Sequence, residues 1–309
     1  MNPTRPYPKI KGLIAATFTP FSDSGRINPS VISQYAQRLK AQGVAGVFVN
    51  GSSGEGLLLS SHERMLLTEA WAAHSDDNFK IIVHIGGASV EMVKELAVHC
   101  QATKGIYAVA SMAPNFFASS EVPVIADYCR QVAAAAPQLP FYYYHLPVMT
   151  GARIKVHQLL QHVAASIPNF AGVKFTYTDF MDMHQCLALD DQRFDILHGH
   201  DEILLSGLVL GIQAAIGTTF NFIPNVYHQV MQAHARNDLE AARAWQLRSI
   251  QVVEVMLKYV NAIVGGKAIM QYTGIDCGPC RTPLRNLTVR ELDQLHKELD
   301  AIQFDAIKG

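Results

Sequence analysis

The sequence predicts an α/β protein, a (β/α)8 TIM barrel with a C-terminal helical appendage. Two observations lead to this prediction. Short apolar runs of strand length alternate with amphipathic stretches of helical length over roughly the first 220 residues, the pattern of repeated β–α units and a parallel sheet. The 309-residue chain is also long enough for one such barrel, which takes roughly 250 residues, plus a short extra element.

Strands are expected at eight places where apolar residues form short runs. These are Gly12–Thr19, Gly46–Asn50, Lys80–Ile85, Tyr107–Met112, Pro140–His145, Ala171–Phe175, Phe194–His198 and Ala214–Thr218. An open doubly wound sheet would show a similar alternation, so periodicity alone does not decide between the two folds. The number of strands favours the closed barrel.

Helices are expected where apolar residues recur at spacings of three and four. Between the strands such segments include Ser30–Gln42, Ser61–His74, Ser89–Thr103, Val122–Ala136 and Ile203–Leu210. After Phe222 only helical patterns remain, at Asn237–Val260, Lys267–Tyr272 and Thr288–Phe304. The last begins with Thr288 and Glu291 at the spacing of a capping box. We therefore expect a catalytic barrel over residues 1–224 and a helical extension over residues 225–309 that packs on it.

The balance of charge argues against polyanionic partners. Lys and Arg number 25 and Asp and Glu 26, so the net charge is −1, and no basic field favours nucleic acid or an anionic membrane. Neither Met1–Lys11 nor any later segment has the apolar run of a targeting or membrane-spanning sequence. The five cysteines are an odd set in a long chain and are expected to be reduced thiols. Together these features predict a soluble, cytoplasmic protein.

The loop Asn50-Gly51-Ser52-Ser53-Gly54-Glu55-Gly56 follows the second expected strand, where barrels carry functional groups. Its glycines allow a tight turn and close approach to a ligand, and the hydroxyl and N–H groups of Ser52 and Ser53 can surround a carboxylate. An ordinary tight turn with hydroxyl caps explains the same residues, and phosphate is an alternative ligand.

A tyrosine stands at the end of strand five and a lysine at the end of strand six. Lys174 lies in an apolar strand, where loss of hydration is expected to lower its pKa and give the neutral amine that attacks a carbonyl. Tyr144 ends the neighbouring strand, about 4.8 Å away, and its phenol can relay protons. Alternation puts Tyr142 and Tyr144 on one face and Tyr143 on the other. Core packing is the alternative explanation for Tyr144.

Two further loops are rich in glycine and short polar side chains, which suit a polyhydroxylated ligand. They are His198-Gly199-His200-Asp201-Glu202 and Gly217-Thr218-Thr219. Because each ligand hydroxyl needs a matched donor or acceptor, a sugar-like substrate is expected here.

These motifs resemble those of the pyruvate-dependent aldolases, the family that includes dihydrodipicolinate synthase and N-acetylneuraminate lyase. The matching segments are Gly51-Ser52-Ser53-Gly54-Glu55, Tyr144-His145-Leu146-Pro147 with Thr150-Gly151, and Gly172-Val173-Lys174. Where the synthases have an arginine two residues after the proline this chain has Met149, and it has Phe116 and Phe117 where they have a tyrosine that completes a proton relay. The chain is more similar to the lyase branch, in Tyr142-Tyr143-Tyr144-His145 and Gly199-His200-Asp201-Glu202.

The resemblance implies a Schiff-base aldolase that cleaves N-acetylneuraminate reversibly to N-acetylmannosamine and pyruvate, without metal or coenzyme. Lys174 would form the imine, Tyr144 would carry the proton, and Ser52 and Ser53 would hold the carboxylate. The residues implied for the hydroxylated tail are Thr176, Gly199, Asp201, Glu202 and Thr218. Threonine at 218, where many lyases have serine, adds a methyl group that could tune the sugar accepted. The resemblance also implies a homotetramer.

Other interpretations remain open. Another pyruvate aldolase of the family, such as a 2-keto-3-deoxy sugar acid aldolase or dihydrodipicolinate synthase, would share the same catalytic pair. A non-enzymatic sialic-acid-binding regulatory protein is expected to have lost the lysine or the tyrosine. Cys277-Gly278-Pro279-Cys280 has a redox spacing but falls in the helical appendage. His198 and His200 could ligate a metal, but on the seventh strand rather than the first. Gly265-Gly266-Lys267 is only a fragment of a phosphate loop and is interpreted as packing.

Overall fold

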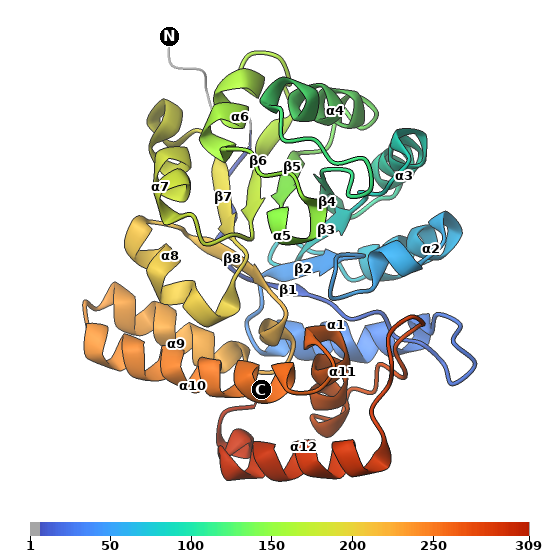
Figure 1. Cartoon of the computed structure of the whole chain (residues 1–309), viewed down its shortest axis with the longest axis vertical. Coiled ribbons are helices and arrows are strands. Elements are labelled where there is room, and N and C mark those ends of the chain that lie inside the picture. Colours follow the sequence, from blue (N-terminus) through green and yellow to red (C-terminus); the bar gives the residue numbers. More distant parts are fainter. Residues whose placement is uncertain (1–6, 309) are drawn as a thin grey trace.

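The computed structural model describes residues 7–308, and eight parallel strands close into a barrel in chain order, with β1 paired to β8 (Figure 1). The strands are β1 (Gly12–Ala16), β2 (Gly46–Val49), β3 (Lys80–His84), β4 (Ile106–Met112), β5 (Phe141–His145), β6 (Phe170–Phe175), β7 (Asp195–His198) and β8 (Ala214–Gly217). All eight expected strands are confirmed, and closure excludes the open doubly wound sheet. Residues 1–6 of the expected barrel segment lie outside the described residues.

Helices surround the barrel and form a group at one side of it (Figure 1). They are α1 (Ile32–Ala41), α2 (Ser61–Ala72), α3 (Val90–Ala102), α4 (Val122–Ala134), α5 (Pro147–Thr150), α6 (Val156–Val163), α7 (Phe180–Ala188), α8 (Leu204–Leu210), α9 (Pro224–Ala235), α10 (Leu239–Leu257), α11 (Ala262–Tyr272) and α12 (Val289–Ala301). Helix α10 packs on α9, α11 and α12, and α9 packs on α8. Helix α9 begins at residue 224, next to the expected boundary between the barrel and the C-terminal extension. That boundary remains a prediction.

The alternation of side chains along the strands separates two apolar clusters. One lies inside the barrel and includes Ile14, Phe48, Tyr142 and Tyr144, and the other lies between strands and helices and includes Tyr143. The three consecutive tyrosines of β5 therefore divide as alternation predicts. The Tyr142 hydroxyl donates to Asp195 Oδ2 at 3.1 Å, at the start of β7.

The helical pattern of the C-terminal segment is confirmed, with one difference at α11. The sequence predicts a start at Lys267, whereas the helix begins at Ala262. The glycines inside it permit close packing rather than ending the helix. A Cβ on Gly265 would lie 2.1 Å from the Met256 carbonyl oxygen, and one on Gly266 would lie 2.4 Å from the Phe18 ring. The expected capping box of Thr288 and Glu291 is present at α12.

Candidate active site

Lys174 and Tyr144 face each other across neighbouring strands inside the barrel. They are register partners of β6 and β5, one residue before the end of each strand. Lys174 is only 4% exposed, and its Nζ lies 4.1 Å from the centre of the Tyr144 ring and 4.1 Å from that of Phe48. The predicted proximity of amine and phenol is thus present. The amine is enclosed by aromatic faces at the carboxyl end of the barrel, where (β/α)8 enzymes carry their reacting groups.

Phe48 and His84 complete the walls around this pair. The ring of Tyr144 meets both in edge-to-face contacts, at centroid distances of 5.5 Å from Phe48 and 5.7 Å from His84. Burial, and next the positive charge of Arg64, lower the pKa of His84 to about 3, so its imidazole is neutral. Neither Phe48 nor His84 is among the site residues expected from the sequence. The available signal was the two-residue alternation that places them, like Tyr144, on the inner face of their strands.

The loop after β2 folds into consecutive tight turns. The Gly51 carbonyl accepts from the N–H groups of both Gly54 and Gly56, each at 3.1 Å. A Cβ on Gly56 would lie 1.8 Å from the Asn50 carbonyl oxygen, so the turn requires glycine there. Ser52 lines a cavity of about 210 Å³ that His84 and other residues also line. The cavity therefore connects Ser52 with His84, whose ring contacts that of Tyr144.

The two polar loops expected to bind a sugar lie beside this loop and each other. The hydroxyls of Ser53 and Thr218 are 2.6 Å apart, which joins the loop after β2 to the end of β8. Thr176 Oγ1, just after β6, is buried without a hydrogen-bond partner among the described residues. A Cβ on Gly199 would lie 1.9 Å from that oxygen, so only glycine lets β7 end so close to Thr176.

Asp201 is buried at the end of the barrel and is held by Thr219. Its Oδ2 accepts from the Thr219 N–H and hydroxyl, both at 2.7 Å. Burial, and next the nearby Glu202 carboxylate, raise the pKa of Asp201 to about 7, although the hydrogen bonds from Thr219 oppose the shift. Glu202 itself is more exposed, and one of its oxygens lies 3.7 Å from His200 Nδ1. Asp201 can therefore exist as an acid or as a carboxylate near neutral pH.

The cysteine pair lies in the loop between α11 and α12 and has the properties of buried thiols. Burial raises the pKa of Cys277 to about 12 and that of Cys280 to about 11. Reactive redox cysteines have lowered pKa values. Among the other candidates, His198 stacks on Phe180, and burial lowers its pKa to about 4.

Comparison with known proteins gives consistent similarities over nearly the whole chain. The family model described as the dihydrodipicolinate synthetase family matches residues 9–302. N-acetylneuraminate lyase of Mus musculus is 40% identical, over 97% of this chain and 94% of its own length. The solved N-acetylneuraminate lyase of Proteus mirabilis has a TM-score of 0.92 at 35% identity, covering 96% of this chain and all of its own. A catalytic lysine mutant of the Ruminococcus gnavus sialic acid aldolase has a TM-score of 0.88 at 26% identity, over 96% and 97% of the two chains.

Proposed function

Because the chain belongs to the dihydrodipicolinate synthetase family, we propose that it is a class I aldolase that cleaves N-acetylneuraminate reversibly to N-acetylmannosamine and pyruvate. The observation that carries this function is the buried Lys174 amine, enclosed with the Tyr144 phenol at the carboxyl end of a barrel whose similar proteins are named N-acetylneuraminate lyases. A solved relative is described as a catalytic lysine mutant, which supports a lysine in the central role.

The reaction begins when Lys174, in the unprotonated form that carbonyl attack requires, attacks the C2 ketone of the open-chain substrate. Tyr144 gives its proton to the carbinolamine hydroxyl, which leaves as water, and the product is a protonated imine. The phenolate then takes the proton of the C4 hydroxyl. The C3–C4 electron pair moves into the imine as an enamine forms, and C4 departs as the aldehyde of N-acetylmannosamine. Protonation of C3 by Tyr144 and hydrolysis of the imine release pyruvate and restore both side chains.

The substrate's two ends are assigned to the two groups of loops. Ser52 and Ser53 hold the carboxylate through hydroxyl and backbone N–H groups, in the tight turns described above. The hydroxylated tail is held by Thr176, Gly199, Asp201, Glu202 and Thr218. The buried, unpartnered Thr176 hydroxyl supports this assignment, because a substrate hydroxyl would supply the hydrogen bond that the protein does not.

Borohydride trapping tests the proposal directly. We expect that pyruvate and borohydride together give one adduct, on Lys174, in peptide mass mapping. Two other lysines serve as internal controls, namely Lys267, which is buried in an ion pair with Glu55, and Lys155, which pairs with Asp179 at the surface. An adduct on either of these, or none, would contradict the assignment. Cleavage rates on several 2-oxo sugar acids separate this activity from that of another aldolase of the family.

We also propose a cytoplasmic homotetramer. All five cysteines are free thiols, which is the state that a reducing compartment maintains. No helix within residues 7–308 is long and apolar enough to cross a membrane. The tetramer follows from the family resemblance, and sedimentation measurements on the purified protein test it.

A further inference from the structure

The Glu55 carboxylate of the loop after β2 is held by two residues of the C-terminal extension, Lys267 and Arg281. Its Oε1 lies 2.8 Å from Lys267 Nζ of α11, and its Oε2 accepts from the backbone N–H of Arg281 at 2.7 Å. The side chains of Glu55 and Lys267 are 0% and 4% exposed. Glu55 and Arg281 are 226 positions apart in the chain, so a distant segment fixes a loop of the proposed active site.

The backbone at Glu55 explains why the loop needs such an attachment. Glu55 has a φ of 55°, in the left-handed region that residues other than glycine rarely adopt. Its N–H donates to the Ser52 carbonyl at 3.1 Å, so the conformation of Glu55 closes the turn that contains Ser52 and Ser53. A conformation of this kind persists when the surrounding structure holds it. Anchoring of the Glu55 carboxylate therefore helps to fix where the two serines point.

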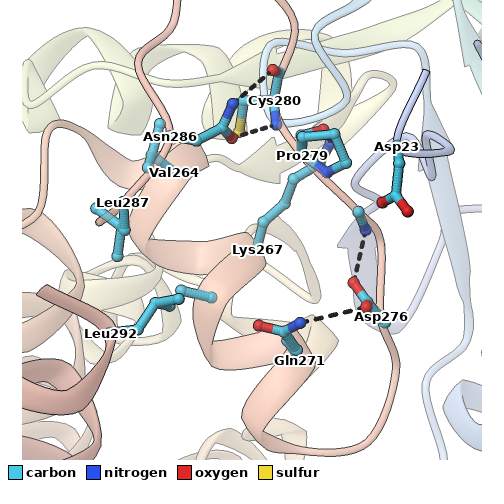
Figure 2. A pocket seen from close by; sticks show the side chains of 12 residues that line it. Asp23, Val264, Lys267, Gln271, Asp276, Pro279, Cys280, Asn286, Leu287 and Leu292 are labelled. Carbon is cyan, nitrogen blue, oxygen red and sulfur yellow. Dashed lines mark hydrogen bonds between the residues drawn. The ribbon is translucent and has the colours of Figure 1, made fainter. Parts of the chain in front are cut away.

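Lys267 is held in place by the segment Cys277–Cys280. Its Nζ donates to the Pro279 carbonyl at 2.9 Å and lies 4.4 Å from the centre of the Phe21 ring. Gly278 has a φ of 63°, and a Cβ there would lie 2.0 Å from the Phe21 carbonyl oxygen. Figure 2 shows Lys267 extending from α11 towards this segment. Asp276 Oδ1 accepts from the Gly278 N–H, and the Asn286 side chain accepts from the Cys280 N–H and donates to the Cys280 carbonyl, so these bonds also hold the segment. The two cysteines thus belong to a structural support for Lys267.

The guanidinium of Arg281 secures the other anchor. It donates to the carbonyl oxygens of Leu58 and Gly25, at 3.0 and 2.8 Å, and to both carboxylate oxygens of Glu63 at the start of α2. These bonds connect the C-terminal loop to the segment that follows the Ser52–Glu55 turn. The Arg281 backbone N–H is consequently held at the place where Glu55 needs a donor.

We propose that Glu55, Lys267 and the Arg281 backbone are positioning residues, which hold the Ser52–Glu55 turn in the shape that receives the carboxylate of a 2-oxo acid. This rests on the proposed role of Ser52 and Ser53 as carboxylate ligands. The C-terminal extension is then part of the substrate-binding machinery. A purely structural ion pair would affect all ligands equally, whereas a positioning role affects only those that carry the carboxylate.

The test compares two ketones that both form an imine with Lys174. Pyruvate carries the carboxylate, and hydroxyacetone is a neutral ketone without it. The protein is the full chain with Glu55→Gln and Lys267→Met together, because removing both charges leaves neither one buried and unpaired. We measure the rate of borohydride inactivation against ketone concentration. The half-saturating concentration of pyruvate is expected to rise about tenfold, the effect of one lost hydrogen bond to a charged group, while inactivation with hydroxyacetone keeps the wild-type rate.

A matched control removes an ion pair of the same extension far from the turn. Lys258→Met breaks the exposed pair with Glu298 and should leave both ketones unaffected. An unchanged pyruvate dependence in the double variant, or an equal loss with both ketones, overturns the proposal. If the double variant does not fold, Glu63→Gln takes its place, because it weakens the bonds that the Arg281 guanidinium donates to Glu63. This variant must also bind pyruvate more weakly, by a smaller factor, and keep the wild-type rate with hydroxyacetone. A wild-type protein that forms no imine with pyruvate would instead refute the proposed function.

Discussion

In the proposed mechanism, proton transfer depends on the Tyr144 hydroxyl, and the neighbouring Tyr143 of β5 provides a control. Tyr144→Phe should slow cleavage of N-acetylneuraminate by roughly 10²–10⁴-fold, because positioned proton transfer contributes about that much. Lys174→Ala should abolish cleavage and retain the fold. Tyr143→Phe should keep full activity, since its buried hydroxyl lies on the outer face and has no hydrogen-bond partner within residues 7–308. Steady-state kinetics of the three variants measure this, and a wild-type rate in Tyr144→Phe removes that residue from the mechanism.

Asp201 should make the stability of the fold depend on pH. Its pKa is raised to about 7, above the ordinary value of 3.8, so the folded state prefers the protonated carboxyl. This contribution is fully present below the unfolded-state pKa and is lost as pH rises through about 7. Asp201→Asn has no carboxyl group there, so its stability does not show this loss. The unfolding free energy of the variant minus that of the wild type should therefore increase by about 3 kcal/mol when the pH is raised from 5 to 8. Urea unfolding at several pH values measures it, and a difference that stays constant with pH contradicts it.

The sequence predicts a functional role for one of the two lysines that are buried among the described residues, Lys174, and not for the other, Lys267. Both stand alone in apolar segments, where a cation needs a reason to be buried. The role of Lys174 is predictable because consecutive strands of a barrel are neighbours, which places Tyr144 of strand five beside Lys174 of strand six. The partner of Lys267 is Glu55, which lies in a distant loop, and no local pattern places the two together. The serines of the loop after β2 could be predicted as candidate ligands from the local sequence, whereas the ion pair of Glu55 with Lys267 could not.

At the scale of elements, the ends of β6 and β7 approach so closely that the spacing depends on a single glycine. In Gly199→Ala the new methyl group would overlap Thr176 Oγ1, so the Thr176 hydroxyl must move. We expect the KM for N-acetylneuraminate to rise about tenfold, as for a lost hydrogen bond, while borohydride trapping with pyruvate alone keeps its wild-type dependence. A parallel loss of pyruvate trapping would mean that the strand ends shift as far as Lys174.

Strands were predictable to within a few residues because each is a short apolar run that parallel pairing buries on both faces. The helices were less completely predicted. Helices α6, α7 and α9 match none of the residue ranges named from the sequence, and they have eight, nine and twelve residues. Helices of this length are marginal in isolation and form because tertiary packing stabilises them. Buried residues such as Leu159 and Leu160 of α6 and Met183 of α7 provide that packing.

At the scale of the whole molecule, one part of the surface is more apolar than a single chain requires. Phe116 and Phe117, in the loop after β4, are 80% and 86% exposed, and their rings stack edge to face at 5.0 Å. Val148 and Met149 of α5 are also exposed, and Ser120 Oγ donates to the Gly151 carbonyl, which joins the two loops. Apolar patches of this kind mark contacts with other protein surfaces.

This patch should be part of the proposed tetramer, and a charge placed in it should weaken assembly. Phe117→Asp would bury a carboxylate without a partner at the interface, which strongly disfavours association. We expect sedimentation of the variant to show species smaller than the tetramer of the wild type at the same concentration. Since Phe117 makes its ring contact with Phe116 at the surface, the fold of each chain should remain, as circular dichroism would show. Leu247→Asp, on the exposed face of α10, provides a control of equal charge. If Phe117→Asp remains a tetramer, or if Leu247→Asp dissociates instead, the interface lies elsewhere on the molecule.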